Sequence, residues 1–248
     1  MNITTKSILL FLTGFTLLLS SSFAVGFKKY NELFKNLSPS DQKKFTESLN
    51  KGQKLASEKR MFEALDALAV AEKIIPNHPS IRLTDASIEV HFRNFAAAEK
   101  IYQGLYNEDP DNIVVLFNLG EMQFVQGKWK FAVERFEDSV AKTYTVKKEP
   151  IYYIAEYKAY ICYRKLGNET KAQAIADKYD YKTDDPIYYY IQVEKALSNG
   201  DKETASRYQQ RAARIFGRSA GLLFPYVDSL EESGYLESLS SGAGEIDQ

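Results

Sequence analysis

Apolar residues between Phe45 and Ser219 recur at helical spacing, in paired segments that are separated by a short polar or glycine-containing turn. In residues 113–146 the apolar positions fall three to five residues apart within each segment, with a break at Gln126, Gly127 and Lys128. The apolar positions are Leu116, Leu119, Phe124, Trp129, Ala132 and Phe136. This spacing is typical of an amphipathic helix, and the glycine-containing break is typical of a turn. The pattern therefore predicts two helices joined by a turn.

The paired segments repeat with a period of 34 residues. Ala64, Ala98 and Ala132 are each 34 residues apart, and two further sets of landmarks keep the same interval. These sets are Pro76 with Pro110, and Gly52 with Ala86 and Gly120. A fixed period of this length indicates a repeat architecture. The predicted units are 45–78, 79–112 and 113–146 and, after an insertion at 147–150, the less regular units 153–185 and 186–219.

Small residues and prolines explain why the units have this form. Gly120 and Ala132 stand where the two backbones of a helix hairpin approach, and a larger side chain would force the hairpin apart. Proline lacks the backbone donor that a helix needs in order to continue, so Pro76 and Pro110 end the second helices. In the last two units Tyr160 and Val193 replace the small residue, and we expect these helices to be splayed or to face a partner.

The segment NLGEMQFVQGKWKFAVERF (residues 118–136) resembles the tetratricopeptide repeat. The matching positions are Asn118, Leu119, Gly120, Gly127, Trp129, Ala132 and Phe136. The resemblance extends over 45–219 and implies an all-α fold: an α-α superhelix (TPR-like solenoid) of about five helix-turn-helix repeats. The ends of such an array need polar or amphipathic caps. We expect an N-terminal capping helix at 25–44, with its helical residues at 27–37, a C-terminal capping helix at 220–239 and a flexible tail at 240–248.

The N-terminal residues have the pattern of a secretory signal peptide. Lys6 is the only charged residue before Lys28, residues 8–19 are mainly apolar, and Ser22 and Ala24 supply small residues where a signal peptidase acts. We expect cleavage after Ala24, so that 1–24 is a signal peptide and the protein is exported, periplasmic or secreted. The alternative is an uncleaved membrane anchor formed by residues 7–27, which carry no charge and have about the length that spans a bilayer.

Composition excludes several classes of protein. The chain has 248 residues, and its 32 Lys and Arg against 33 Asp and Glu give a formal net charge of −1. Nucleic-acid binding requires an excess of clustered basic residues, so we expect no nucleic-acid partner. Cys162 is the only cysteine, which excludes an internal disulfide. A hydrophobic content of 44% is ample for a packed core.

Residues that could carry catalysis lack the sequence context that catalysis needs. His78 lies in the Pro76-Asn77-His78-Pro79 connection, where we expect a solvated loop residue, and Cys162 stands among apolar neighbours as a buried thiol. Acidic pairs such as Asp184 and Asp185 fit helix ends and solubility better than metal binding. There is no phosphate-binding loop, metal-ligand spacing or glycine-rich nucleotide motif. We therefore predict no enzyme activity, no cofactor, no metal and no catalytic residue.

In tetratricopeptide repeats the first helices line a groove that receives an extended peptide or a partner's helix. The resemblance therefore implies partner contacts from outward positions of the first helices. These positions are Thr84, Ser87, His91, Phe117, Asn118, Glu121, Phe124, Tyr157, Lys158, Tyr188, Tyr190 and Glu194. For Phe117, Phe124 and Tyr157, packing between adjacent helices is an equal alternative. A dense group of tyrosines in the last two units either fills the helix seams or forms a partner-binding face around Tyr188, Tyr189 and Tyr190.

The predicted function is that of a non-catalytic protein interaction scaffold, which binds a peptide or partner helix in an envelope or extracytoplasmic assembly. Asn118 and Lys158 match two elements of the clamp by which some members of the family grip a C-terminal carboxylate. Leu83, Ser87 and Ile154 stand where its other polar ligands are expected, so we reject that clamp. The main alternative is a permanent structural subunit of a multiprotein complex. An enzyme is a third alternative, which would require a cleft of perturbed carboxylates away from the groove.

Overall fold

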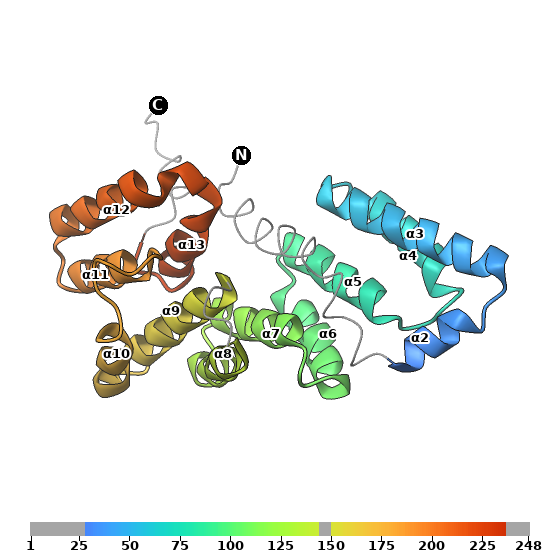
Figure 1. Cartoon of the computed structure of the whole chain (residues 1–248), viewed down its shortest axis with the longest axis horizontal. Coiled ribbons are helices and arrows are strands. Elements are labelled where there is room, and N and C mark those ends of the chain that lie inside the picture. The colour runs from blue at the N-terminus through green and yellow to red at the C-terminus, as the bar shows by residue number, and fades with distance from the viewer. Residues whose placement is uncertain (1–27, 144–149, 237–248) are drawn as a thin grey trace, which may run out of the picture. The chain divides into compact units, whose positions relative to one another are not determined.

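The structure is a computed structural model that describes residues 28–143 and 150–236 (Figure 1). These residues form twelve α-helices and one 3-10 helix, and they contain no strand, which confirms the predicted all-α fold of helix-turn-helix repeats. Contacts divide the chain between Val115 and Leu116, within helix α7 (Ile113–Val125), into an N-terminal and a C-terminal unit. The predicted signal peptide and the tail at 240–248 lie outside the described residues.

The N-terminal unit contains α2 (Lys28–Lys35) and two hairpins. Helix α3 (Pro39–Ser57) pairs with α4 (Met61–Glu72), and α5 (Pro79–His91) pairs with α6 (Phe95–Glu108) (Figure 1). Helix α3 begins before Phe45, because the Ser38 hydroxyl caps it by accepting a hydrogen bond from the Asp41 amide at 3.1 Å, and Pro39 suits the first helical position. The residues expected as an N-terminal capping helix are thus divided between α2 and the first turns of α3.

The C-terminal unit begins within α7. It contains three helix pairs, of which the first is α7 with α8, and a last helix. Its helices are α8 (Trp129–Thr143), α9 (Pro150–Lys165), α10 (Glu169–Ala176), α11 (Ile187–Ser198), α12 (Lys202–Phe216), the 3-10 helix η3 (Gly217–Leu222) and α13 (Phe224–Glu232). Rings of Phe117 and Phe124 on α7 contact Phe136 on α8, with centroids 5.6 and 6.0 Å apart. Helices α9 and α10, and α11 and α12, form the next two hairpins.

The small residues of the repeat lie where helices of one hairpin approach each other. Ala64, Ala98 and Ala132 are completely buried. A Cβ atom added to Gly120 would lie 3.0 Å from Cε1 of Phe136, and one added to Gly52 would lie 2.6 Å from Cδ2 of Leu68. Because real Cβ contacts are longer, a side chain at Gly52 requires the Leu68 side chain to shift, and one at Gly120 requires the Phe136 ring to give way.

All five hairpins use the same turn between their helices. The residue in the left-handed conformation is Lys59, Arg93, Gly127, Gly167 or Gly200, with φ between 62° and 74°. In each turn the amide of the next residue donates to a carbonyl five positions earlier, at 2.8 to 2.9 Å. This is the Schellman arrangement, which satisfies carbonyls that the end of a helix leaves unpaired. The same turn therefore forms in the two hairpins that have Lys59 or Arg93 in place of glycine.

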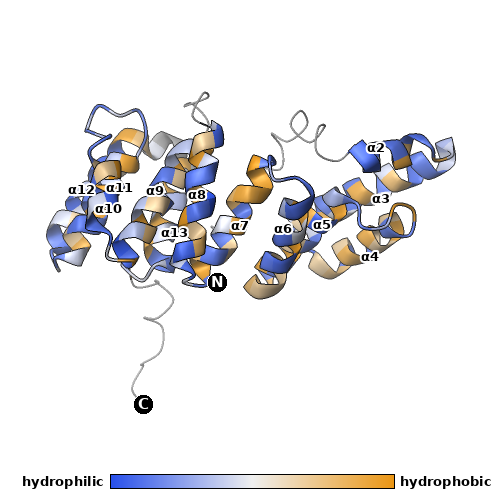
Figure 2. Ribbon diagram, turned by 90° about the horizontal axis from the view of Figure 1, so that it is seen from below, coloured by the Kyte–Doolittle hydropathy of each residue, from blue (hydrophilic) through white to orange (hydrophobic). Residues whose placement is uncertain are grey.

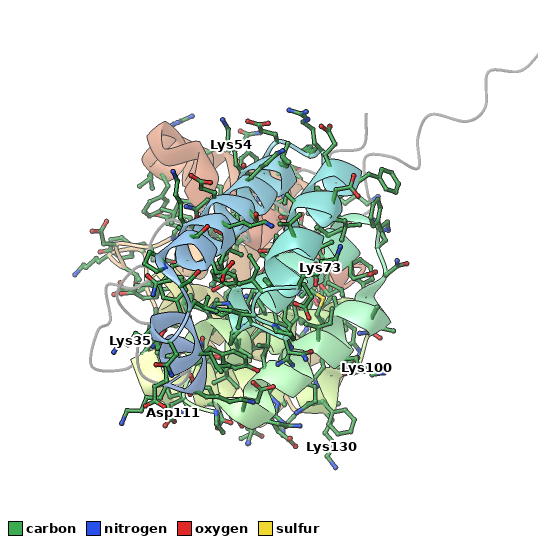
Figure 3. The ribbon with its side chains drawn as sticks, turned by 90° about the vertical axis from the view of Figure 1, so that its right-hand side faces the viewer. Lys35, Lys54, Lys73, Lys100, Asp111 and Lys130 are labelled. Carbon is green, nitrogen blue, oxygen red and sulfur yellow. The ribbon has the colours of Figure 1, made fainter. Side chains whose placement is uncertain are left out.

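Hydropathy separates the buried and exposed faces of the helices. In Figure 2 apolar residues gather on α4, whereas α12 is mainly hydrophilic. Lys54, Lys73 and Lys100, labelled in Figure 3, are exposed side chains of the N-terminal unit. Among the helices that the structure describes, none combines the length and the apolar character needed to cross a bilayer.

Candidate interaction surfaces

The first-helix residues predicted in the N-terminal unit are mostly engaged with their own helix. The Thr84 hydroxyl is buried and donates to the Ser80 carbonyl oxygen at 2.8 Å, while the half-buried Ser87 hydroxyl donates to the Thr84 carbonyl oxygen at 2.7 Å. His91 is half-buried, and its Nδ1 has no hydrogen-bond partner among the described residues. Burial, with a smaller contribution from Lys59, lowers the pKa of His91. Ser87 and His91 thus stay partly accessible.

An exposed aromatic surface lies at the turn end of the two hairpins of this unit. Phe62 at the start of α4 is 76% exposed, Phe92 after α5 is 40% exposed, and Leu65 on α4 is 38% exposed. The Phe62 and Phe92 rings are in contact, with centroids 5.8 Å apart, and the His91 ring lies 5.7 Å from that of Phe92. We call Phe62, Leu65 and Phe92 the turn-end patch. Monomeric proteins rarely expose several neighbouring large apolar side chains without a use.

Charged residues border the turn-end patch. Arg60 donates to Glu63, with Nε 2.7 Å from Oε1, and the two exposed side chains form a local ion pair. Arg93 lies over the Phe95 ring, 5.5 Å from its centroid. Apolar residues within a polar rim are typical of protein interfaces. Sequence reasoning missed this patch, although the large ring of Phe62 stands where the corresponding positions of the next two units hold Ala96 and Lys130.

His78 corrects one prediction from the sequence. It is not a solvated loop residue but the N-cap of α5, where its Nδ1 accepts a hydrogen bond from the Ser80 amide at 3.2 Å. Its ring lies edge-on to Tyr30 and Phe45, with centroids 5.5 and 5.0 Å away. Burial among these rings lowers its pKa to about 4. The imidazole therefore stays neutral and serves the packing of α2 and α3 against the start of α5.

In the C-terminal unit, the predicted groove residues Phe117, Phe124 and Tyr157 are buried. Of the two alternatives for these side chains, the structure supports packing between helices. Phe124 lies between Trp129 and Phe136, with ring centroids 5.1 and 6.0 Å away. Asn118 is also buried on α7. These residues are therefore part of the core, and they leave little surface for a partner.

Lys158 forms the centre of a buried charge cluster. Its Nζ lies 3.0 Å from Oε1 of Glu121 on α7 and 3.1 Å from Oε2 of Glu232 on α13, and it stands 4.3 Å from the centroid of the Phe124 ring. Only 3% of the Lys158 side chain is exposed. The two carboxylates raise the pKa of Lys158 despite its burial, while burial raises the pKa of Glu121 to about 7. One lysine thus joins two acidic residues from different helices.

Glu194 is a second buried charge, not a groove contact. Its carboxylate accepts hydrogen bonds from Nε of Arg164 at 3.0 Å and from the Ser198 hydroxyl at 2.7 Å. It also accepts one from the hydroxyl of Tyr160. Tyr160 is the residue that replaces the small residue of the repeat, and it is completely buried. The larger ring at this position therefore connects α9 to α11 by a hydrogen bond.

The tyrosines of the last units pack mainly within the C-terminal unit. Tyr189 and Tyr190 are buried, while Tyr188 is half-buried with its ring 6.4 Å from that of Tyr208. The Tyr190 ring stacks on Tyr226 of α13 with centroids 5.1 Å apart, and its carbonyl oxygen accepts from the Tyr157 hydroxyl at 3.3 Å. The predicted partner-binding face around Tyr188, Tyr189 and Tyr190 is thus largely covered.

Helix α13 covers the first-helix side of this unit. It packs against both α9 and α11, the first helices of two successive hairpins (Figure 1). Tyr226 lies 5.0 Å from the Tyr157 ring and donates its hydroxyl hydrogen to Asp185, the buried residue before α11. The surface that the sequence predicts as a groove therefore already holds a helix of the same chain.

The perturbed carboxylates lie apart from one another along the chain. Burial raises the pKa of Asp85 to about 6, with help from Glu72 and Glu89, and raises the pKa of Asp185 to about 6. Burial also raises the pKa of the Cys162 thiol, which is completely enclosed. Within the described residues no three His, Cys, Asp or Glu side chains are placed to hold a metal ion. Each perturbed group is explained by its burial and its neighbours.

The fold and these surfaces define a TPR-like array of helix hairpins. No family model matches the chain, and no curated protein matches it. A solved structure of PilF from Pseudomonas aeruginosa is similar with a TM-score of 0.38 and 15% identity, over 74% of this chain and 96% of that one. A similarity of this degree carries no argument about function. The functional interpretation rests on the chain's own residues.

Proposed function

We propose that the protein is a non-catalytic interaction scaffold that binds another protein through its helical hairpins. The observation that carries this proposal is the turn-end patch, in which Phe62 and Phe92 are exposed side by side. Exposed apolar surface is unfavourable in water, and a partner that covers it recovers that free energy. Helical hairpin repeats in general present extended binding surfaces.

The proposed contact is on the N-terminal unit. Ser87 and His91 on α5 stay partly accessible, and His91 stands beside Phe92 at the patch. The first-helix side of the C-terminal unit is covered by α13. A partner segment with one or two apolar anchors and a polar group that meets His91 fits the chemistry of this surface.

We further propose that the scaffold acts in an extracytoplasmic or envelope assembly. The support is the N-terminal sequence, with its apolar residues 8–19 and the small residues Ser22 and Ala24. A permanent structural subunit of a multiprotein complex would use the same patch. An exchangeable scaffold would also exist as a free single chain, whereas a permanent subunit would be present only in the complex.

Site-specific photocrosslinking in the organism that encodes the protein tests the contact. A photoreactive amino acid replaces Leu65 in the patch, and the matched control replaces Tyr181, which is 66% exposed in the C-terminal unit. We expect a discrete adduct from position 65 and none from position 181. The substitutions Phe62→Ser and Phe92→Ser, made together, should abolish the adduct while the circular dichroism spectrum stays unchanged.

Two outcomes would contradict the proposal. One is an equal pattern of adducts from both positions, and the other is an adduct at position 65 that survives the double substitution. Size exclusion of the native extract separates the two forms of the proposal. A fraction that elutes at the mass of the single chain indicates an exchangeable partner, and its complete absence indicates a permanent subunit.

A further inference from the structure

Helix α12 carries a row of arginines on the side that faces away from its hairpin partner. The helix packs against α11, and its buried residues are Ala205 and Ala212. Arg207, Arg211 and Arg214 stand at positions i, i+4 and i+7, which lie along one face of a helix. At the angular step of an α-helix, this face is opposite the two buried alanines. All three arginines are exposed, and we call them the arginine row.

The charge of α12 differs from that of the rest of the chain. Residues 202–216 contain four basic residues and one acidic residue, Glu203, and the helix is mainly hydrophilic (Figure 2). The whole chain, in contrast, has 32 basic and 33 acidic residues, so the remaining sequence has an excess of acidic residues. The positive charge is therefore a local property of this helix, and a partner attracted by it meets the arginine row.

Little of this charge is neutralised within the protein. Nη1 of Arg207 lies 3.7 Å from Oε1 of Glu203, in a pair whose side chains are 60% and 84% exposed. Exposed pairs of this kind are weak. Arg211 lies over the Tyr208 ring, 5.6 Å from its centroid, and neither Arg211 nor Arg214 forms an ion pair with a described residue. Guanidinium groups bind phosphate oxygens through two parallel hydrogen bonds, which makes a phosphate-bearing partner suitable for this row.

An exposed apolar side chain borders the arginine row. Ile215 follows Arg214 directly, stands four residues after Arg211 and is 55% exposed. An aliphatic side chain gains nothing from the sugar-phosphate backbone of a nucleic acid, whereas it gains free energy at the boundary between headgroups and acyl chains. Basic residues beside an exposed apolar residue on a helix are typical of surfaces that lie on anionic membranes.

We propose that the arginine row and Ile215 form a contact site for an anionic lipid bilayer. The arginines bind the phosphates of the headgroups, and Ile215 enters the boundary beneath them. The helix itself does not insert, because its buried face stays packed on α11. The site lies in the C-terminal unit and the turn-end patch in the N-terminal unit, so this proposal and the proposed protein contact can fail independently.

The contact should be reversible and sensitive to salt. Each basic residue close to an anionic surface strengthens binding roughly fivefold, and this attraction acts within about one Debye length. A few arginines and one isoleucine therefore orient the protein on a membrane without anchoring it permanently.

A fluorescent probe on α12 tests the contact in the full chain. Because Cys162 is completely buried, the substitution Ile215→Cys supplies an accessible thiol for an environment-sensitive apolar dye. We expect its emission to shift to shorter wavelength with vesicles of phosphatidylcholine that contain about one third phosphatidylglycerol. The shift should be absent with phosphatidylcholine alone and should be lost at high salt. The probe reports on α12 itself, so attachment of a vesicle through the apolar residues 8–19 does not imitate this result.

A pair of substitutions in the row should weaken the contact. Arg211→Gln and Arg214→Gln, made together, should raise the lipid concentration at half-saturation by a factor on the order of ten or more. The matched control is Lys73→Gln with Lys100→Gln, which makes the same change of net charge at exposed positions of the N-terminal unit (Figure 3). It should leave the half-saturating concentration within about twofold of the original value. Circular dichroism confirms that both variants are folded.

Several outcomes would overturn the proposal. Equal effects of the two pairs of substitutions would show that attraction depends on net charge alone. An equal shift with neutral vesicles, or no shift with anionic ones, would exclude recognition of anionic lipid by the row. Displacement of the protein from vesicles by duplex DNA at an equal concentration of phosphate would assign the row to nucleic acid, and displacement by polyglutamate would assign it to an acidic protein.

Discussion

At the scale of single residues, burial rather than catalytic design explains the perturbed titrations. His78, Glu121 and Asp185 lie in different parts of the fold, and each has its pKa moved by loss of water. A shift between folded and unfolded states makes stability depend on pH. Two of these groups give tests of opposite sign.

His78 should make the protein less stable in acid. Its pKa falls from 6.5 to about 4 on folding, so the unfolded chain binds the proton first as the pH falls through this window. We expect His78→Asn, which keeps a capping side chain, to gain about 1 to 2 kcal/mol relative to wild type between pH 7.5 and pH 4.5. Urea unfolding at both values measures this difference. His91→Asn is the control with a less buried ring, and an equal gain in both variants would contradict the assignment.

Glu121 should act in the opposite direction. Its pKa rises from 4.5 to about 7 on folding, so the folded state holds the proton more tightly, and the stability this provides is lost as the pH rises through 7. We expect the free energy of unfolding of Glu121→Gln, relative to wild type, to increase between pH 5 and pH 8. Urea titrations across this range measure it, and a difference that does not change with pH would argue against the buried position of Glu121.

At the scale of elements, the turn of every hairpin requires one residue with a positive φ, and the residues at that position differ in how easily they adopt it. Gly127, Gly167 and Gly200 adopt a positive φ without cost, whereas Lys59 and Arg93 place a Cβ in the left-handed region. The repeat therefore holds two strained turns, both in the N-terminal unit. Packing of the helices on either side maintains them.

Relief of one strained turn should stabilise the protein. Lys59 is exposed with a φ of 63°, and we expect Lys59→Gly to raise the free energy of unfolding by about 0.5 to 1 kcal/mol. Thermal unfolding followed by circular dichroism measures the change. Lys54→Gly, five residues earlier within α3, is the matched control and should destabilise by about 1 kcal/mol. The same sign for both variants would refute the explanation.

At the scale of the whole molecule, the proposed location depends on the first residues of the chain. If the signal peptide is recognised, the exported protein begins at Val25. We expect mass spectrometry of protein secreted by a bacterial host to give this N-terminus, and Ala24→Phe to leave the longer chain. An intact Met1 terminus on membrane-associated wild-type protein would favour the anchor alternative.

The helices and their pairing could be predicted from the sequence, because they depend on local spacing. The 34-residue interval of Ala64, Ala98 and Ala132 follows from one steric requirement repeated along the chain, and all three residues are fully buried. Short-range patterns such as these are set by helix geometry alone. Which first-helix residues are exposed was harder to predict from the sequence, because outward and inward positions follow each other within a single turn of a helix.

Only the tertiary structure decided which of those positions are exposed. Phe124, Tyr157 and Glu194 become buried because neighbouring helices and α13 cover them, while Phe62 and Phe92 stay exposed because no described helix packs on the turn end. Lys158 meets Glu232 across 74 residues, a distance over which periodicity carries no information. The sequence by itself thus determined the repeated hairpins, through local sterics and spacing. The three-dimensional packing decided which residues remain available to a partner.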